Sequence, residues 1–324
     1  MEKLRVIQEK LRLDGIFEFL KMVIGFLYYY YRKLILKREI VLKNIHGYKM
    51  FLNIQVEGVS RTLDIHKIHE RLETELIKEV LLPGMVILDV GANIGYYALL
   101  EAFLIGTGGL VYALEPFPRN YNLLLKNIHL NDYQDRIKLF RIAAGDETGT
   151  AKLYLGPSDN NHCLVKNDHL INIFQEVRGA YSDSVEVETV ILDDFLKGRE
   201  KIDFIRMDLE GFECQVIDGL KETLTRDRPD LFFEIHPIGD IDPDPRYTPY
   251  IEYLLGLGYK AKSLICPARK NTLSRFSELG YEPKKISFSG LVHSIRYDNI
   301  NSGDLIKVAA RRPKITRALY LTCR

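Results

Sequence analysis

The chain has 324 residues, of which 46% are hydrophobic and 27% are charged, and this globular composition excludes a disordered, collagen-like or disulfide-stapled protein. Its length predicts one large domain or two ordinary ones. Lys and Arg together number 45 and Asp and Glu 44, which argues against a general nucleic-acid binder because such a protein needs a basic surplus.

Four cysteines are scattered along the chain and form no CxxC pair, which excludes zinc-ribbon and thioredoxin-type sites. Reduced thiols in a chain of this length are typical of the cytosol. The first apolar stretch lacks the small-residue cleavage site of a secretory signal. We therefore predict a cytoplasmic protein, with membrane association left open by the N-terminal segment.

Residues 16–37 predict a helix that is apolar and aromatic around most of its circumference. The ten uncharged residues 22–31 cover only about 15 Å, half of a hydrocarbon core of about 30 Å, so we expect no membrane span. One interpretation is a helix docked on the protein's own core or on a second subunit. The other is a peripheral membrane contact through residues 16–38, in which a basic cluster faces anionic headgroups: Arg32, Lys33, Lys37 and Arg38.

Two further elements precede the central region. Alternating apolar residues over 39–55 flank His46-Gly47 and predict a β-hairpin. A helical pattern then runs from about His66 to Leu82 and stops at Pro83-Gly84.

The central region reads as a strand, a glycine-rich turn and a helix. Residues 85–89 (MVILD) are the apolar run of a strand buried on both faces, VGANIG follows at 90–95, and residues 96–105 have helical spacing. We expect Gly91 to permit the tight turn and Gly95 to let the helix start close to the strand. We expect the backbone N–H groups of the turn to be free for a ligand.

A second strand at 110–115 ends in Glu115, where a carboxylate can accept hydrogen bonds from two ribose hydroxyls. The turn lacks GxGxxG because Asn93 holds the middle position, and no Walker loop is present. Asp89 would repel a diphosphate and suits a cationic amino group. The charge therefore favours S-adenosylmethionine over NAD.

These blocks give the chain a family resemblance. LDVGANIGYYAL (88–99), ALEPFP (113–118), DFIRMDLEGFECQVIDG (203–219) and FFEIHP (232–237) resemble, in order and spacing, the FkbM family of S-adenosylmethionine-dependent methyltransferases, over roughly residues 65–265. One departure is Arg206, where the family usually has Lys.

The resemblance implies an α/β class I methyltransferase (Rossmann-like) fold, a seven-stranded doubly wound sheet that is parallel except for one strand. Strands are expected at 85–89, 110–115, 137–142, 202–207, 231–235, about 259–265 and 304–310. The predicted organisation is an N-terminal amphipathic helix and start of a hairpin (1–45), a methyltransferase domain (46–312) with an insertion at about 267–300, and a basic C-terminal tail (313–324).

Two groups of site residues follow. Residues predicted to bind the cofactor lie after the first three strands: Asp89, Gly91, Ala92, Asn93, Gly95, Glu115, Pro116, Ala144 and Asp146. Residues predicted to be catalytic end the fourth and fifth strands, where Glu234 also lies: Asp208, Glu210 and His236. They can act as a general base, position the substrate, or hold a divalent metal that binds a diol. This residue set is permissive rather than diagnostic, so we assign no metal.

The predicted function is O-methylation of a hydroxyl on a sugar, glycolipid or secondary metabolite by in-line transfer from S-adenosylmethionine. One alternative is a catalytically inactive S-adenosylmethionine-binding protein. A less favoured one is an NAD-dependent oxidoreductase, because GxGxxG is missing. A nucleic-acid methyltransferase is disfavoured by the charge balance and by DLEG (208–211) where such enzymes carry an NPPY-type tetrapeptide.

Overall fold

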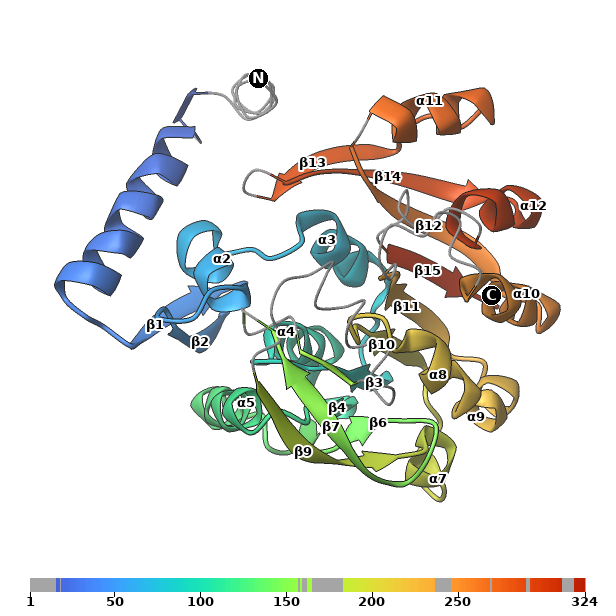
Figure 1. The fold of residues 1–324 in the computed structure, drawn as a ribbon, viewed down its shortest axis with the longest axis horizontal. Helices are drawn as coiled ribbons and strands as arrows, with labels where there is room; N and C mark the ends of the chain where they lie inside the picture. The colour runs from blue at the N-terminus through green and yellow to red at the C-terminus, as the bar shows by residue number, and fades with distance from the viewer. Residues whose placement is uncertain are drawn as a thin grey trace.

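The computed structural model describes residues 16–17, 19–156, 158, 162–164, 183–236, 246–268, 270–289, 292–310 and 318–323. A large mixed sheet crosses the molecule and helices pack on both of its faces (Figure 1). The order of the strands in this sheet is β13-β14-β12-β15-β11-β10-β3-β4-β5.

Seven neighbouring strands form the expected class I methyltransferase sheet. They are β5 (Ile137–Phe140), β4 (Leu110–Leu114), β3 (Val86–Val90), β10 (Phe204–Met207), β11 (Asp230–Glu234), β15 (Ala318–Thr322) and β12 (Lys260–Pro267). The strands from β5 to β11 pair in parallel, and β15 is antiparallel to both of its neighbours. The predicted fold class is therefore confirmed, as are six of the predicted strands to within a few residues.

Alternate side chains of the strands enter two separate cores, one on each face. Leu88 and Val90 of β3 face one core, and Ile87 faces the other. The first core is covered by α7 (Leu192–Leu196), α8 (Glu213–Asp218), α9 (Lys221–Arg226) and α10 (Tyr247–Gly256). The second is covered by α3 (Arg71–Val80), α4 (Tyr96–Ile105, followed by η2, Gly106–Gly108) and α5 (Pro118–Leu130).

The prediction of the last strand was wrong. Within 304–310 the chain is helical, as α12 (Ser302–Leu305) and η3 (Ile306–Ala310), and the Asn301 side chain caps α12 by accepting a hydrogen bond from Asp304 N at 2.9 Å. The strand is β15, inside the stretch predicted as a basic tail, and all five of its residues are buried. Periodicity does not distinguish a short buried strand from a short buried helix. The basic positions between 311 and 317 lie outside the described residues.

The predicted insertion extends the sheet. It contains α11 (Lys270–Glu278), β13 (Lys285–Ser289) and β14 (Val292–Ile300), and β14 pairs antiparallel with β12. Lys285 forms an ion pair with Glu75 at 2.6 Å, which joins the added strands to α3. The excursion before the last strand therefore runs from the end of β12 to the start of β15.

A second sheet of short strands lies beside the large one, in the order β6 (Ala143–Ala144), β9 (Asp183–Val190), β7 (Gly149–Leu155) and β8 (Cys163–Leu164). None of the four described cysteines, Cys163, Cys214, Cys266 and Cys323, forms a disulfide.

The predicted hairpin is present as β1 (Ile40–Ile45) and β2 (Tyr48–Asn53). His46 and Gly47 form its turn with φ of 51° and 102°. The helix predicted from about His66 to Leu82 corresponds to α3, while a separate helix, α2 (Val59–His66), ends where it was expected to begin.

The N-terminal helix includes residues 16–17 and 19–30 and continues as η1 (Tyr31–Ile35). One side of it packs on the domain, where Tyr29 donates a hydrogen bond to Ile54 O at 3.0 Å and Arg32 pairs with buried Asp64. The other side exposes large apolar side chains. Among the described residues, no helix combines the length and the hydropathy that a membrane crossing requires.

Candidate active site

The loop between β3 and α4 is held in close contact with two other parts of the site. Gly91 has a φ of +86°, and a Cβ added there would lie 2.3 Å from Asp208 O. Gly95 has a φ of +92°, and a Cβ added there would lie 2.2 Å from Leu124 Cδ1 on α5. Both positions therefore require glycine. Gly95 permits the approach of α5, however, and not only the approach of the strand that the sequence suggested.

The backbone N–H groups of this loop are used within the chain. Those of Gly91 and Ala92 donate to Leu114 O at 3.0 and 2.9 Å, and that of Gly95 donates to Ala92 O at 2.9 Å. Asn93 N donates to Glu115 Oε2 at 2.8 Å. The expectation that these N–H groups are free for a ligand was therefore wrong, because the loop uses them to fix its own shape.

Glu115 stands beside the glycine loop. It directly follows β4, is buried, and its second oxygen accepts a hydrogen bond from Phe117 N at 2.9 Å. These two backbone bonds fix the carboxylate at the carboxyl end of the sheet. Pro116, which follows it, is half-buried.

The third predicted cofactor segment lies at the same end of the sheet. Ala144 is buried in the apolar core that also contains Val90 and Met207, the last residues of β3 and β10. Asp146 is exposed. The cofactor roles of both positions stay predictions.

A buried ion-pair chain links β3 to β10. Arg206 is paired in register with Asp89, and its Nη1 lies 3.1 Å from Asp89 Oδ1. Its Nη2 lies 3.1 Å from Asp208 Oδ2, and its guanidinium carbon is 3.9 Å from the centre of the Tyr97 ring. Burial alone would lower the pKa of Arg206, but the two carboxylates outweigh it and raise that pKa. The fully buried Asp89, which the sequence assigned to a cationic ligand group, thus faces a cation of its own chain.

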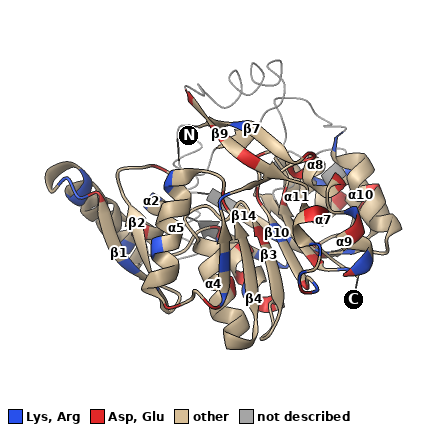
Figure 2. Ribbon diagram, turned by 90° about the horizontal axis from the view of Figure 1, so that it is seen from below, with Lys and Arg blue, Asp and Glu red and all other residues tan. Residues whose placement is uncertain are grey.

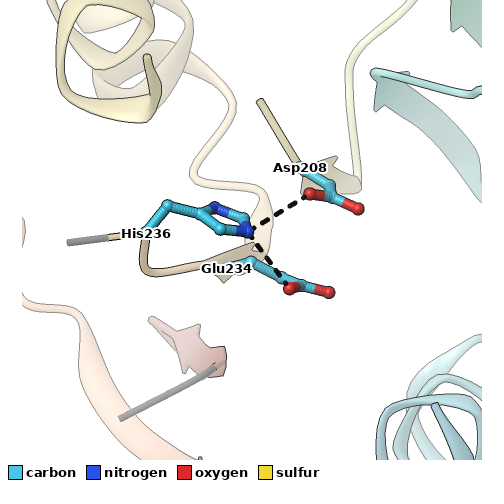
Figure 3. A group of neighbouring side chains, drawn as sticks. All are labelled: Asp208, Glu234 and His236. Atoms are coloured by element: carbon cyan, nitrogen blue, oxygen red, sulfur yellow. Dashed lines mark ion pairs between the residues drawn. The ribbon is translucent and has the colours of Figure 1, made fainter. Parts of the chain in front are cut away.

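The residues predicted for the catalytic rim meet at the ends of β10 and β11. His236 Nε2 lies 3.6 Å from Glu234 Oε2 and 3.8 Å from Asp208 Oδ1, and Figure 3 shows both carboxylates on the same side of the imidazole. Glu210 Oε2 is also 3.8 Å from Nε2. The convergence predicted from the strand ends is present, although the roles of the residues stay predictions.

Glu213, the first residue of α8, is a further carboxylate of this site that the sequence prediction did not include. It is fully buried, and its Oε1 lies 2.8 Å from His236 Nδ1. Its Oε2 accepts a hydrogen bond from Tyr247 OH at 3.1 Å. Burial alone would raise the pKa of Glu213, but the neighbouring His236 holds it below its ordinary value. The sequence signal was the spacing in DLEGFE, which places this carboxylate in the first turn of α8.

The carboxylates control the charge of His236. Burial alone would lower its pKa, but Glu210, Glu213 and Asp208 outweigh burial and raise the pKa of His236 to about 10. In the chain as described, the imidazole is therefore positively charged at neutral pH.

A cavity of about 210 Å³ lies elsewhere, between the hairpin and α5. It touches the glycine loop through Ile94, and its described lining also includes Asn53, Asn120 and Lys126. The rim carboxylates are not part of that lining, so it is distinct from the site above.

Comparison with known proteins identifies the family. Residues 89–261, more than half of the chain, match the family described as "Methyltransferase FkbM domain". The chain is 31% identical over 182 residues to the 2-O-methyltransferase NoeI of Sinorhizobium fredii, covering 53% of this chain and 70% of that protein. It is 27% identical over 157 residues to the methyltransferase sdnD of Sordaria araneosa, covering 42% of this chain and 60% of that protein.

Among solved structures, the chain is similar to the methyltransferase FkbM of Methylobacillus flagellatus, with a TM-score of 0.39 and 16% identity. The aligned region covers 74% of this chain and 53% of that protein. The family match spans β3 to β12, the part of the fold that carries the glycine loop, Glu115 and the rim. The chain belongs to the FkbM family of methyltransferases.

Proposed function

We propose that this methyltransferase transfers a methyl group from S-adenosylmethionine to a hydroxyl oxygen of a sugar, glycolipid or secondary metabolite. The observation that carries the proposal is the contact between the two loops, in which Gly91 approaches Asp208 O closely enough to exclude a side chain. This contact supports the proposal because the loop predicted to bind the cofactor lies directly beside a rim of carboxylates and a histidine. The relative named as a 2-O-methyltransferase supports an oxygen acceptor.

The residues present fit an adenosine cofactor with a cationic sulfonium. Glu115 offers a fixed carboxylate for ribose hydroxyls, with Asn93 bonded to it. Ala92, Pro116, Ala144 and Asp146 complete the predicted cofactor side. When bound, the sulfonium supplies an activated methyl group. Asp89 acts indirectly in this proposal, because it holds Arg206 and thereby the loop after β10.

The rim would bind the acceptor and help its proton to leave to water. Asp208, Glu210 and His236 all offer polar atoms at the end of the sheet, next to the cofactor loop. The side chain of Asp208 is 27% exposed, against 12% for Glu210 and 5% for Glu234, so Asp208 is the carboxylate most accessible to an entering hydroxyl. In-line transfer then depends mainly on alignment and on exclusion of water.

Calorimetry tests the cofactor assignment. S-adenosylhomocysteine should bind the purified chain, and Glu115→Gln should weaken binding by about 10- to 150-fold, since charge-assisted hydrogen bonds contribute about 1.5–3 kcal/mol. Glu186→Gln, which alters an exposed acid on β9, is the matched control. A folded chain that releases no heat with S-adenosylmethionine or S-adenosylhomocysteine, or that binds NADH instead, would refute the assignment. A screen with labelled methyl groups then separates an active enzyme from an inactive binding protein.

A nucleic-acid acceptor is not supported. Figure 2 shows basic and acidic residues interspersed along the described ribbon. The near balance of 45 basic and 44 acidic residues also gives no surplus of positive charge for a phosphate backbone.

We also propose that the N-terminal helix rests on an anionic membrane surface. Its outward side exposes Ile24, Leu27 and Ile35 to 64%, 67% and 69%. Lys37 and Arg38 are exposed directly after it and can reach anionic headgroups. An apolar face with basic residues at its border is typical of helices that lie in the interface. Flotation with vesicles of phosphatidylcholine and phosphatidylglycerol tests this; a chain that stays at the bottom of the gradient, or that pairs with a second copy through this helix, would exclude it.

A further inference from the structure

His236 lies among four carboxylates, and only one of them is at hydrogen-bonding distance. Glu213 contacts Nδ1 at 2.8 Å. The three that surround Nε2 are at 3.6–3.8 Å: Asp208, Glu210 and Glu234. Those three separations are too long for hydrogen bonds. A cation bonded at about 2.1 Å to Nε2 and to an oxygen would leave the two atoms about 3.0–4.2 Å apart, depending on the angle at the cation.

The histidine is oriented for such a role. Metal-binding histidines usually give their second ring N–H to a carboxylate, which fixes the tautomer and the direction of the lone pair. Glu213 occupies that position at Nδ1, and its own orientation is fixed by Tyr247 OH and by the backbone N–H groups of Leu209 and Gly211. A cation that displaces the proton of Nε2 would therefore meet a lone pair directed toward the other three carboxylates.

The local charge also calls for a cation. Together with Asp89, the cluster contains five carboxylates, and its basic neighbours among the described residues are Arg206 and Arg246. A neutral His236 would leave an excess of three negative charges, and like charges at such distances repel strongly inside a protein. A divalent ion offsets most of that excess.

We propose that a divalent transition-metal ion binds between His236 Nε2, Asp208 and Glu234, with Glu210 as a further oxygen ligand. Candidate donor atoms of the first three residues all lie within 4.8 Å of one another. One imidazole nitrogen with carboxylate oxygens suits Mn²⁺, Fe²⁺ or Zn²⁺ better than Mg²⁺ or Ca²⁺, which prefer oxygen ligands. The three ligands come from the ends of two adjacent strands, so the sheet itself holds the site (Figure 3).

The consequence for catalysis rests on the proposed function. A metal at the rim can bind two neighbouring oxygens of a sugar and ease loss of the proton from the hydroxyl to be methylated. That proton passes to water, the new O–CH₃ bond forms as the C–S bond breaks, and the sulfonium becomes the neutral thioether of S-adenosylhomocysteine. The acceptor class is therefore a vicinal diol, such as two adjacent sugar hydroxyls.

Metal binding is measured on the full chain after treatment with EDTA. Titration with Mn²⁺, followed by calorimetry and by the electron paramagnetic resonance of the free ion, should show one site per chain. Glu234→Gln and Asp208→Asn should each weaken it at least about tenfold, while the exposed control Glu186→Gln leaves it unchanged. Asp208 is the most accessible ligand, so its variant decides the question if the Glu234 variant does not fold.

The outcomes separate this inference from the proposed function. S-adenosylhomocysteine binding is measured on the same EDTA-treated chain. A chain that binds S-adenosylhomocysteine but takes up neither Mn²⁺ nor Zn²⁺ at millimolar concentration overturns the metal site alone. Equally tight binding of the ion to both ligand variants also overturns the metal site. Failure to bind S-adenosylhomocysteine refutes the proposed function, whatever the metal does.

Discussion

Replacing Arg206 by Met tests whether the buried ion-pair chain holds the two halves of the site together. Arg206 is 3% exposed and lies 3.1 Å from a carboxylate oxygen on each side, one of them on the fully buried Asp89. Met fills much of the same space along Tyr97 but has no charge. The change therefore removes the cation while leaving Asp89 in the core.

The expected cost is large because one charge of a buried pair loses its partner. Removing one member of such a pair costs about 3–5 kcal/mol. Water cannot solvate the Asp89 carboxylate, because its side chain is fully buried. Among the described residues, its Oδ2 has no hydrogen-bond partner. We therefore expect Arg206→Met to lower the free energy of unfolding by an amount in that range. Arg206→Lys, which restores the residue usual in the family, keeps the charge but loses the two-pronged geometry, and should cost about 1 kcal/mol.

Urea denaturation followed by far-UV circular dichroism measures these differences. The double variant Asp89→Asn with Arg206→Met removes both charges, so it should be more stable than the sum of the two single changes predicts, by about 0.5–3 kcal/mol. If Arg206→Met unfolds within about 1 kcal/mol of the natural chain, or if the two changes are additive, Arg206 does not compensate Asp89 and the reasoning fails.

Three further predictions concern other features. Gly91→Ala should abolish S-adenosylhomocysteine binding, because the added Cβ would clash with Asp208 O. Gly84 has a similar φ of +84° but open space around it, so Gly84→Ala should cost only about 1 kcal/mol of stability and leave binding intact. Calorimetry on both variants checks this difference. Burial, and then Asp89, raise the pKa of Glu101 well above its ordinary value, so the folded chain binds a proton that the unfolded chain releases, and stability falls as pH rises above about 4.3. Glu101→Leu should therefore stabilise the chain more at pH 8 than at pH 5 in urea denaturation, and an equal gain at both pH values would contradict this. Leu27→Glu should reduce flotation with anionic vesicles without changing S-adenosylhomocysteine binding, and undiminished flotation would count against the membrane contact.

The parts of the fold predictable from sequence were those encoded over a few consecutive residues. The strand, turn and helix at 85–105 combine a continuous apolar run with Gly91 and Gly95 at positions of positive φ. The turn of the hairpin at His46-Gly47 is encoded in the same local way. The last strand is not encoded in this local way, because residues 304–310 and β15 are both short apolar stretches. Which of the two forms the strand depends on which one pairs between β11 and β12, and that is a long-range contact.

The site could be predicted as a set of residues but not as a network. Parallel strands place their carboxyl ends at one edge, so Asp208 and His236 had to lie near the glycine loop once the strands were known. The pairing of Arg206 with Asp89 requires β10 to be the neighbour of β3. No local sequence pattern specifies the order of the strands, so this ion pair could not be predicted.

The same reasoning applies to the charge of Asp89, whose cofactor role stays a prediction. An acid at the end of a buried strand looks available to a ligand when only its own strand is considered. The adjacent strand supplies a guanidinium at the same register, and that cation in turn holds Asp208 of the rim. The carboxylate therefore acts on the second half of the site through Arg206, and a change at residue 89 should disturb the rim as well as the glycine loop.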